Sequence, residues 1–310
     1  MIAVALTGTV LLLFLFTILV GLPFRYVEVL ILVPLLRTAF TVGNRELTGN
    51  PFWPSHHEAL GLVRVLAVVA GGVATHLLHV HLPVGSVVAS GLVGLVAAIL
   101  LPSLAVPIFC GTFVGMASPE LFQVPQVVVS GLIAGLVYES GRGVFAGFGG
   151  KLGTIALIGC ITTVLLWPGI TFLPGVVTPR EQLPLYLLWG ALGAYGTFTL
   201  QQYLPARISP PVFASAVVGL AGAVTLEGTA ALVVFAASFA GMSSSERIPY
   251  RWLMIPAGII AALVVVYSAP VFGGTGGKLG AAAFGAVVAV HGVHRAHKPA
   301  DSFDQPSRGE

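Results

Sequence analysis

The feature that most constrains this chain is an internal repeat. The segment FCGTFVGMASPE at 109–120 matches FAASFAGMSSSE at 235–246 at six of twelve positions. The segment VFAGFGGKLG at 144–153 matches VFGGTGGKLG at 271–280 at eight of ten. Both blocks keep their order, at offsets of 126 and 127 residues, so one insertion or deletion separates them. This self-similarity predicts a duplicated unit of about 105–125 residues.

Composition then decides the environment of the repeated unit. Apolar residues make up 56% of the 310 residues and charged residues only 8%, whereas a soluble domain has about 25% charged residues. So few charges cannot cover a soluble surface. We therefore predict an all-α polytopic membrane protein, which excludes a cytosolic enzyme, a secreted disulfide scaffold and a disordered chain. The two cysteines, Cys110 and Cys160, lie in apolar runs without metal-ligand spacing.

Apolar runs separated by Pro, Gly and charge predict about twelve transmembrane segments. Several runs are shorter than the roughly 20 residues of a full crossing, so they are expected to be tilted, broken or re-entrant. The first run lacks a basic start and is long enough to span, which favours a retained helix over a cleaved signal. The runs lie near 2–22, 26–42, 63–82, 84–101, 104–118, 125–140, 150–167, 184–204, 210–226, 229–244, 251–268 and 278–294.

The repeat divides the chain into five parts. Residues 1–62 hold two N-terminal helices and a polar loop, 63–167 form the first membrane repeat, 168–183 link the repeats, and 184–296 form the second. Residues 297–310 are predicted to be a disordered cytoplasmic tail. Five crossings per repeat is an odd number, so the sequence predicts two inverted five-helix repeats. Inverted repeats recur in transporters and channels.

The distribution of Lys and Arg predicts the orientation. If all twelve runs cross, one face receives eleven of these cations, and the other receives Arg25, Arg180 and Lys278. The positive-inside rule then places both termini in the cytoplasm, in a multi-pass protein of the plasma (inner) membrane. If the FxxxFxGMxS runs are instead re-entrant, the split falls to nine against five, which favours the first arrangement.

The two GGKLG blocks are the first candidate binding segments. Glycines allow backbone conformations that other residues avoid, and a helix that begins here presents free amides and a positive dipole end. With an adjacent lysine, this combination suits an anion. The alternative is that the lysines reach to headgroups as interface anchors and the glycines form tight turns. The candidate residues are Gly149, Gly150, Lys151, Gly276, Gly277 and Lys278.

The second candidate is the pair of FxxxFxGMxS runs. Their Gly111/Gly115 and Ala237/Gly241 spacing lets helices approach closely, so helix packing is one interpretation. In the other, hydroxyls line a central pathway with phenylalanines as narrow apolar walls. The hydroxyl residues are Thr112, Ser118, Ser238 and Ser244, and the walls are Phe109, Phe113, Phe235 and Phe239.

Catalytic and metal chemistry find little support. No carboxylate falls at the middle of a predicted span, and Glu139 is expected to pair with Arg142 at an interface. The histidines near 76–81 and 291–297 have helical spacing, but no Cys or Asp accompanies them, so interface histidines are favoured over a metal site. We expect no catalytic residue, metal or cofactor. Without a basic stripe interleaved with aromatics, no nucleic-acid partner is expected.

These patterns together favour a transporter or channel for a small solute, with a pathway between the two repeats. An anion or a neutral polar solute is favoured over a metal cation, because acidic ligands are missing. The expected partners are membrane lipid and the solute, and a homo-oligomer remains open. A scaffold or accessory subunit without transport is the first alternative, and a membrane-embedded enzyme is the second.

Overall fold

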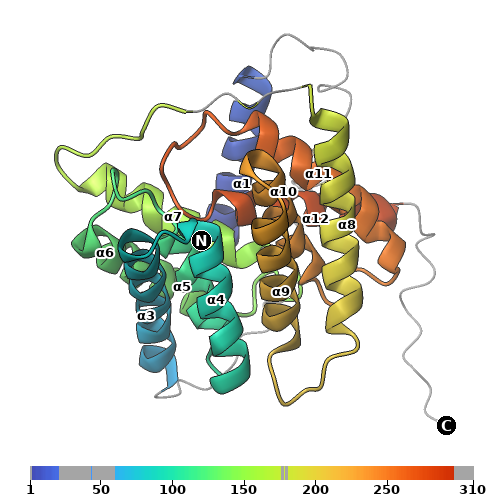
Figure 1. Ribbon diagram of the computed structural model, residues 1–310, viewed down its shortest axis with the longest axis horizontal. Coiled ribbons are helices and arrows are strands. Elements are labelled where there is room, and N and C mark those ends of the chain that lie inside the picture. Colours follow the sequence, from blue (N-terminus) through green and yellow to red (C-terminus); the bar gives the residue numbers. More distant parts are fainter. Residues whose placement is uncertain (1, 21–42, 44–59, 176–177, 179–180, 297–310) are drawn as a thin grey trace.

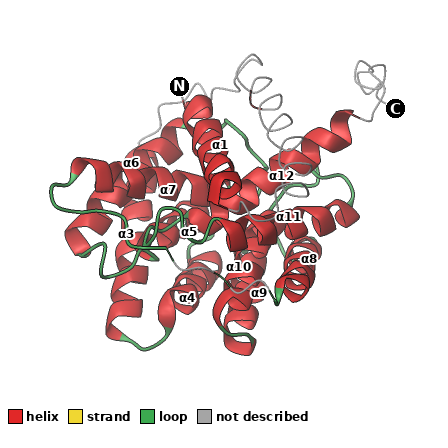
Figure 2. Ribbon diagram, turned by 90° about the horizontal axis from the view of Figure 1, so that it is seen from above, coloured by secondary structure: helices red, strands yellow, loops and turns green. Residues whose placement is uncertain are grey.

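The computed structural model describes residues 2–20, 43, 60–175, 178 and 181–296. Within these residues it is all-helical, with eleven α-helices and one short 3-10 helix (Figures 1 and 2). The only extended pairing in this part of the chain is an isolated bridge between Leu173 and Gly273. The predicted all-α class is confirmed.

The helices fall close to the predicted runs. The predicted second helix, 26–42, and the C-terminal tail lie outside the described residues. Two predicted runs are shorter as helices: α5 stops at Gly115 and α10 at Gly241. The bounds are α1 Ile2–Val20, α3 Leu60–His81, α4 Gly85–Leu100, α5 Ala105–Gly115, α6 Val124–Ser140, α7 Lys151–Leu166, α8 Leu183–Gln201, α9 Pro210–Thr225, α10 Gly228–Gly241, η2 Arg251–Leu253, α11 Met254–Tyr267 and α12 Lys278–Ala296.

Local sequence explains several helix starts. Helices α6, α8 and α9 carry proline at one of their first two positions, where a missing amide hydrogen costs nothing. The start of α6 adds a capping box between Gln123 and Gln126. Helix α7 follows Gly150, whose φ of 80° is left-handed and turns the chain sharply into the helix.

The five-helix sets α3–α7 and α8–α12 pack in matching ways. In the first set α3 packs on α5 and α6, and in the second α8 packs on α10 and α11. The sets meet where α4 contacts α9 and where α7 contacts α12 (Figure 1). Helix α1 lies against α7, α11 and α12, so it belongs to the bundle without being part of either set.

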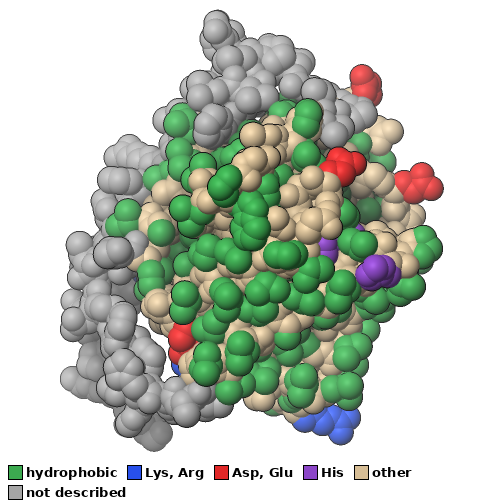
Figure 3. Space-filling model, turned by 90° about the vertical axis from the view of Figure 1, so that its left-hand side faces the viewer, with side chains coloured by type: hydrophobic (Ala, Val, Ile, Leu, Met, Phe, Trp, Pro, Cys, Tyr) green, Lys and Arg blue, Asp and Glu red, His purple; other side chains and the backbone are tan. Residues whose placement is uncertain are grey.

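Apolar helices and an apolar surface are the features of a membrane-associated protein. Two helices of the described chain, Gly61–His81 and Lys278–Ala296, are long and apolar enough to cross a bilayer. The face in Figure 3 is covered largely by apolar side chains, with its few charged groups near the margins. Exposed apolar side chains include Leu62, Leu66, Leu100, Leu136, Leu165, Leu166, Leu188 and Val224. The 11 residues of α5 rise only about 16 Å, roughly half of a hydrocarbon core.

Candidate functional site

The two GGKLG segments meet where α7 and α12 begin. A Cβ atom added to Gly153 would lie 2.5 Å from the Cα of Gly280, and one added to Gly280 would lie 2.6 Å from the Cα of Gly153. Real Cβ atoms do not approach other atoms so closely, because repulsion rises steeply at that distance. Glycine at both positions therefore allows the two helix starts to cross in direct backbone contact.

The loops before these helices have matching conformations. Gly150 and Gly277 have φ values of 80° and 85°. Phe145 and Phe272 also have positive φ, 52° and 50°, which is a strained conformation for a bulky side chain. Strain of this kind persists only where surrounding structure holds it, and it gathers at functional sites.

Each loop is also joined to the end of a helix from the other set. The amide of Ser118, after α5, donates to the carbonyl of Gly274 at 2.8 Å, and the amide of Ser244, after α10, donates to the carbonyl of Gly147 at 2.9 Å. The two hydrogen bonds are reciprocal, because each joins equivalent positions of the two repeated sequence blocks. The ends of α5 and α10 and the starts of α7 and α12 thus converge at the centre of the bundle.

Four phenylalanines fill the space between the ends of α5 and α10. The ring centroids of Phe113 and Phe239 are 4.6 Å apart, those of Phe109 and Phe113 are 4.7 Å apart, and those of Phe235 and Phe239 are 4.5 Å apart. All four side chains are at most 2% exposed. The rings pack at the spacing of favourable aromatic pairs. The sequence predicts that these four residues form narrow apolar walls of a pathway. In the structure they lie together in one cluster.

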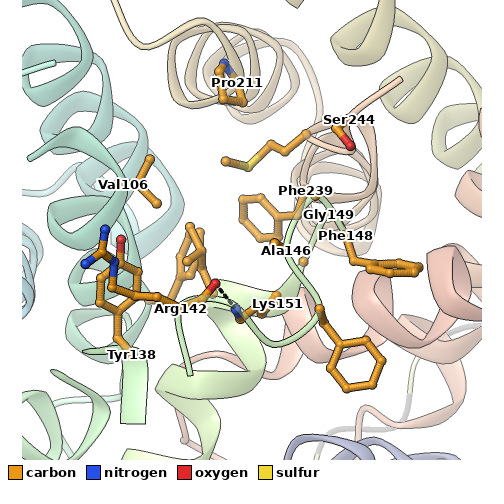
Figure 4. Close-up of a pocket in the computed structure, with 16 residues that line it drawn as sticks. Val106, Tyr138, Arg142, Ala146, Phe148, Gly149, Lys151, Pro211, Phe239 and Ser244 are labelled. Carbon is orange, nitrogen blue, oxygen red and sulfur yellow. Dashed lines mark hydrogen bonds between the residues drawn. The ribbon is translucent and has the colours of Figure 1, made fainter. Parts of the chain in front are cut away.

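Two cavities share Phe113 and Phe239 as a common wall. The larger, of about 370 Å³, lies beside the 145–152 loop and the start of α7 (Figure 4). The smaller, of about 170 Å³, lies beside residues 275–280 and the start of α12. Met242 lines the first and Met116 the second, at equivalent positions of the repeat. Of the predicted site residues, the larger pocket takes Gly149, Gly150, Lys151 and Ser244, and the smaller takes Gly276, Gly277 and Lys278.

The polar groups of the two cavities differ. Arg142, Tyr138 and Ser244 line the larger cavity, whereas Ser86 and Thr275 line the smaller one. A lysine lines each, and the described lining residues of both include no carboxylate. The ionisable side chains that line the two cavities are therefore all basic or neutral.

Both lysines bind the carbonyl end of the preceding helix. The Lys151 ammonium donates to the carbonyl of Gly141 at 2.6 Å, and to that of Arg142 at 3.2 Å (Figure 4). The Lys278 ammonium donates to the carbonyls of Ser268, Ala269 and Val271 at 3.2, 3.0 and 2.8 Å. Lys151 is only 8% exposed. The sequence proposed solute binding or interface anchoring, and this third arrangement was not anticipated.

The four predicted hydroxyl residues occupy different environments. The Thr112 hydroxyl donates to the carbonyl of Phe109 and accepts from Ser90, and the Ser238 hydroxyl donates to the carbonyl of Phe235 and pairs with Ser215. Both residues are fully buried between helices and line neither cavity. The Ser118 hydroxyl accepts the amide of Glu120 and also lies outside both cavities. The Ser244 hydroxyl oxygen is buried at the larger cavity, with no hydrogen-bond partner in the described chain.

The small residues of α5 and α10 do pack helices together. A Cβ atom on Gly115 would overlap the backbone of Gly72 and the side chain of Thr75 in α3. A Cβ atom on Gly241 would overlap Thr197 and the Ala194 carbonyl in α8. The packing and pathway interpretations of these runs are therefore compatible, because the glycines face α3 or α8 while the phenylalanines face the centre.

Glu139 has a partner that the sequence missed. Its two carboxylate oxygens accept from Nε and Nη2 of Arg64, both at 2.7 Å, and the expected ion pair with Arg142 also forms, at 3.5 Å between Nη1 and Oε1. Because 75 residues separate Arg64 from Glu139, no local pattern could reveal the pair. Within the described residues, no group of three or more His, Cys, Asp and Glu side chains gathers as in a metal site.

Comparisons with known proteins add no further constraint on the site. No protein-family model matches the chain, and neither a curated protein nor a solved structure matches it. The two matched cavities and the phenylalanines that line both of them are the structural features that bear on function.

Proposed function

We propose that this protein is a polytopic membrane transporter for a small anion or neutral polar solute. The observation that carries the proposal is the pair of cavities that share Phe113 and Phe239 as a wall. Each cavity lies at the start of one central helix, and matched residues line the two. Phe113 and Phe239 would therefore contact a solute in either cavity.

The phenylalanine cluster is proposed to be the gate. The rings of Phe113 and Phe239 are in contact at 4.6 Å, so this conformation leaves no continuous passage between the cavities. Each ring lies near the end of a helix that is hydrogen-bonded to a loop of the other set. A small relative movement of the ends of α5 and α10 would separate the rings, which fits a carrier better than a permanently open channel.

The lining residues support the solute class. Neither cavity offers a carboxylate among its described lining residues, and each includes the first residues of a helix. Amides and the positive dipole end at a helix start favour an anion or the oxygen atoms of a polar solute. The buried hydroxyl of Ser244 is the strongest candidate for a direct solute contact in the larger cavity.

The proposal includes duplication and an inverted orientation of the two sets. Equivalent residues make equivalent contacts at the Gly153–Gly280 crossing and in the Ser118 and Ser244 hydrogen bonds. The distribution of eleven cations against three supports the proposed cytoplasmic placement of both termini.

Thiol labelling from each side of the membrane tests the proposal. In a background with Cys110 and Cys160 replaced by alanine, Met242→Cys and Met116→Cys place single thiols in the larger and the smaller cavity. We expect a membrane-impermeant thiosulfonate reagent to label Met242→Cys from one side of a proteoliposome only, and Met116→Cys from the other side only. Adding Phe113→Ala and Phe239→Ala is expected to let either side label both positions.

Solute flux provides the matching functional measurement. Proteoliposomes are transferred to isotonic formate, nitrate, phosphate, urea or glycerol, and their volume change is followed by light scattering. At least one of these solutes is expected to enter faster than into protein-free liposomes, and faster still in the double phenylalanine variant. Labelling of both cysteine variants from one side while Phe113 and Phe239 are intact, or unchanged flux for every solute, would overturn the proposal.

A further inference from the structure

Two carbonyl clusters, one after α6 and one after α11, hold an ammonium group at a helix C-terminus. Gly141 and Arg142 supply the first cluster, and Ser268, Ala269 and Val271 supply the second. The carbonyls at a helix C-terminus lack partners inside the helix and carry the negative end of its dipole. A cation is therefore the species that these clusters favour.

The second cluster is the more complete. Three carbonyl oxygens lie between 2.8 and 3.2 Å from the Lys278 nitrogen, and an ammonium group has three N–H donors. The cluster is thus matched in number and distance to a single ammonium group. Backbone carbonyl oxygens are also the groups that replace the hydration shell of a monovalent ion in selective pores.

The ammonium group of each lysine joins the two ends of the loop that precedes its helix. Residues 141–151 and 268–278 each form a closed loop whose two ends are joined by the lysine. Each loop contains a phenylalanine at positive φ, Phe145 or Phe272, and such strain requires support. Holding the loop ends together keeps the starts of α7 and α12 at their crossing.

We propose that each carbonyl cluster is a monovalent-cation site permanently filled by a tethered lysine ammonium. The lysine is then an internal counter-ion that closes the loop, and it is not a ligand for a transported solute. If the side chain is removed, the vacated site should accept a free ammonium or potassium ion from solution. This inference does not rest on the transport proposal, since it concerns only the conformation of the loops.

Ion-dependent stability of Lys278→Ala tests the inference. The purified variant is heated in choline chloride, and choline is then replaced by ammonium, potassium or sodium chloride at constant ionic strength and neutral pH. We expect the midpoint of thermal unfolding in choline to fall by about 4 °C or more relative to the native protein. Ammonium is expected to recover at least half of that loss, with potassium next and sodium least.

Two matched variants separate site binding from a general salt effect. Lys278→Met keeps the apolar length of the side chain without its charge, so it should be destabilised and should not respond to ammonium. Arg207→Ala removes an exposed cation elsewhere and should behave like the native protein in every salt. Equal stabilisation of all variants, or no response of Lys278→Ala to any small cation, would overturn the inference.

A measurement on the native protein covers the case in which Lys278→Ala does not fold. The sequence has three lysines, Lys151, Lys278 and Lys298, and reductive methylation with ¹³C-formaldehyde modifies accessible amines. Lys151 and Lys278 are expected to resist modification at least ten-fold longer in the folded protein than after unfolding, because their ammonium groups are engaged with carbonyls. Equal rates in the folded and the unfolded protein would contradict the inference.

Discussion

The two five-helix sets agree closely at the centre of the molecule and differ at its periphery. At the centre, Thr112 and Ser238 each bond to the carbonyl three residues earlier and to a serine of the neighbouring helix. Lys151 and Lys278 likewise reach back to equivalent carbonyls. The two sets therefore share these interactions at equivalent positions.

One difference lies between the first and fourth helices of each set. Gly115 faces Thr75 in α3 and Gly241 faces Thr197 in α8, which aligns the two helices at an offset of 122 residues. On this alignment Tyr186 takes the place of Arg64, while Glu139 aligns with Val266 at the offset of 127 that relates the loops. The first set therefore has an ion pair where the second has an aromatic and an aliphatic side chain.

A second difference lies in what closes each central loop. At the loop of the first set, Arg247 from the second set donates to the carbonyl of Ala146 at 2.9 Å, and its guanidinium lies 4.6 Å from the ring centroid of Phe148. At the loop of the second set, the amide of Leu173 from the linker donates to the carbonyl of Gly273 at 3.0 Å. A side chain holds one loop and a backbone segment holds the other at the equivalent carbonyl.

The largest effect is expected at the ion pair that only the first set contains. Arg64→Ala leaves the partly buried Glu139 carboxylate with only the longer, more exposed pair to Arg142 at 3.5 Å, and should lower the free energy of unfolding by about 2–4 kcal/mol. The double change Arg64→Tyr with Glu139→Val installs the residues of the second set and should cost less than Arg64→Ala alone. Chemical unfolding of the detergent-solubilised protein measures both.

The matched control for this prediction lies in the second set. Tyr186→Phe removes only a hydroxyl that pairs with Gln182 at 3.2 Å, and should cost about 1 kcal/mol or less. If Arg64→Ala costs no more than Tyr186→Phe, the pair behaves as an ordinary surface salt bridge. The ion pair of the first set would then contribute no more to the free energy of unfolding than the residues at the equivalent positions of the second set.

A smaller effect, equal in both sets, is expected at the helix crossing. Gly153→Ala and Gly280→Ala each force a methyl group against the backbone of the other helix, and should cost about 1–3 kcal/mol. Gly196→Ala in α8 is the control, because nothing lies within 4 Å of its added Cβ atom. Alanine there should be neutral or should stabilise the helix by up to about 1 kcal/mol. The measurement is the midpoint of thermal unfolding. If Gly196→Ala lowers the midpoint as much as Gly153→Ala and Gly280→Ala do, the close contact of the two helix starts is refuted.

The smallest effect is expected at the buried hydroxyl pairs, which occupy equivalent positions in the two sets. Ser90→Ala and Ser215→Ala each remove one hydrogen bond and leave the partner hydroxyl bonded to a carbonyl. Each should cost about 1 kcal/mol, and the two costs should agree within the error of an unfolding titration. A difference of more than about 1 kcal/mol would mean that the two centres are not equivalent in energy.

Much of the helical architecture could be predicted from the sequence, because helix formation and burial leave local signatures. Apolar runs bounded by Pro and Gly placed α3 and α12 within a few residues of their observed bounds. The repeated motifs also brought together the right phenylalanines, since Phe109 and Phe113 are one helical turn apart. These predictions needed only the chain's own periodicity.

Only the tertiary structure decided which contacts the residues of the repeated motifs make. Lys151 reaches carbonyls ten residues earlier, and that approach depends on the left-handed conformations of the intervening loop, which no spacing rule specifies. Arg64 and Glu139 meet because α3 packs on α6. Thr112 was a candidate pathway residue until its partner Ser90 on α4 was placed beside it. The sequence alone determined the helices and their repetition, whereas long-range packing decided which polar groups satisfy one another and which line a cavity.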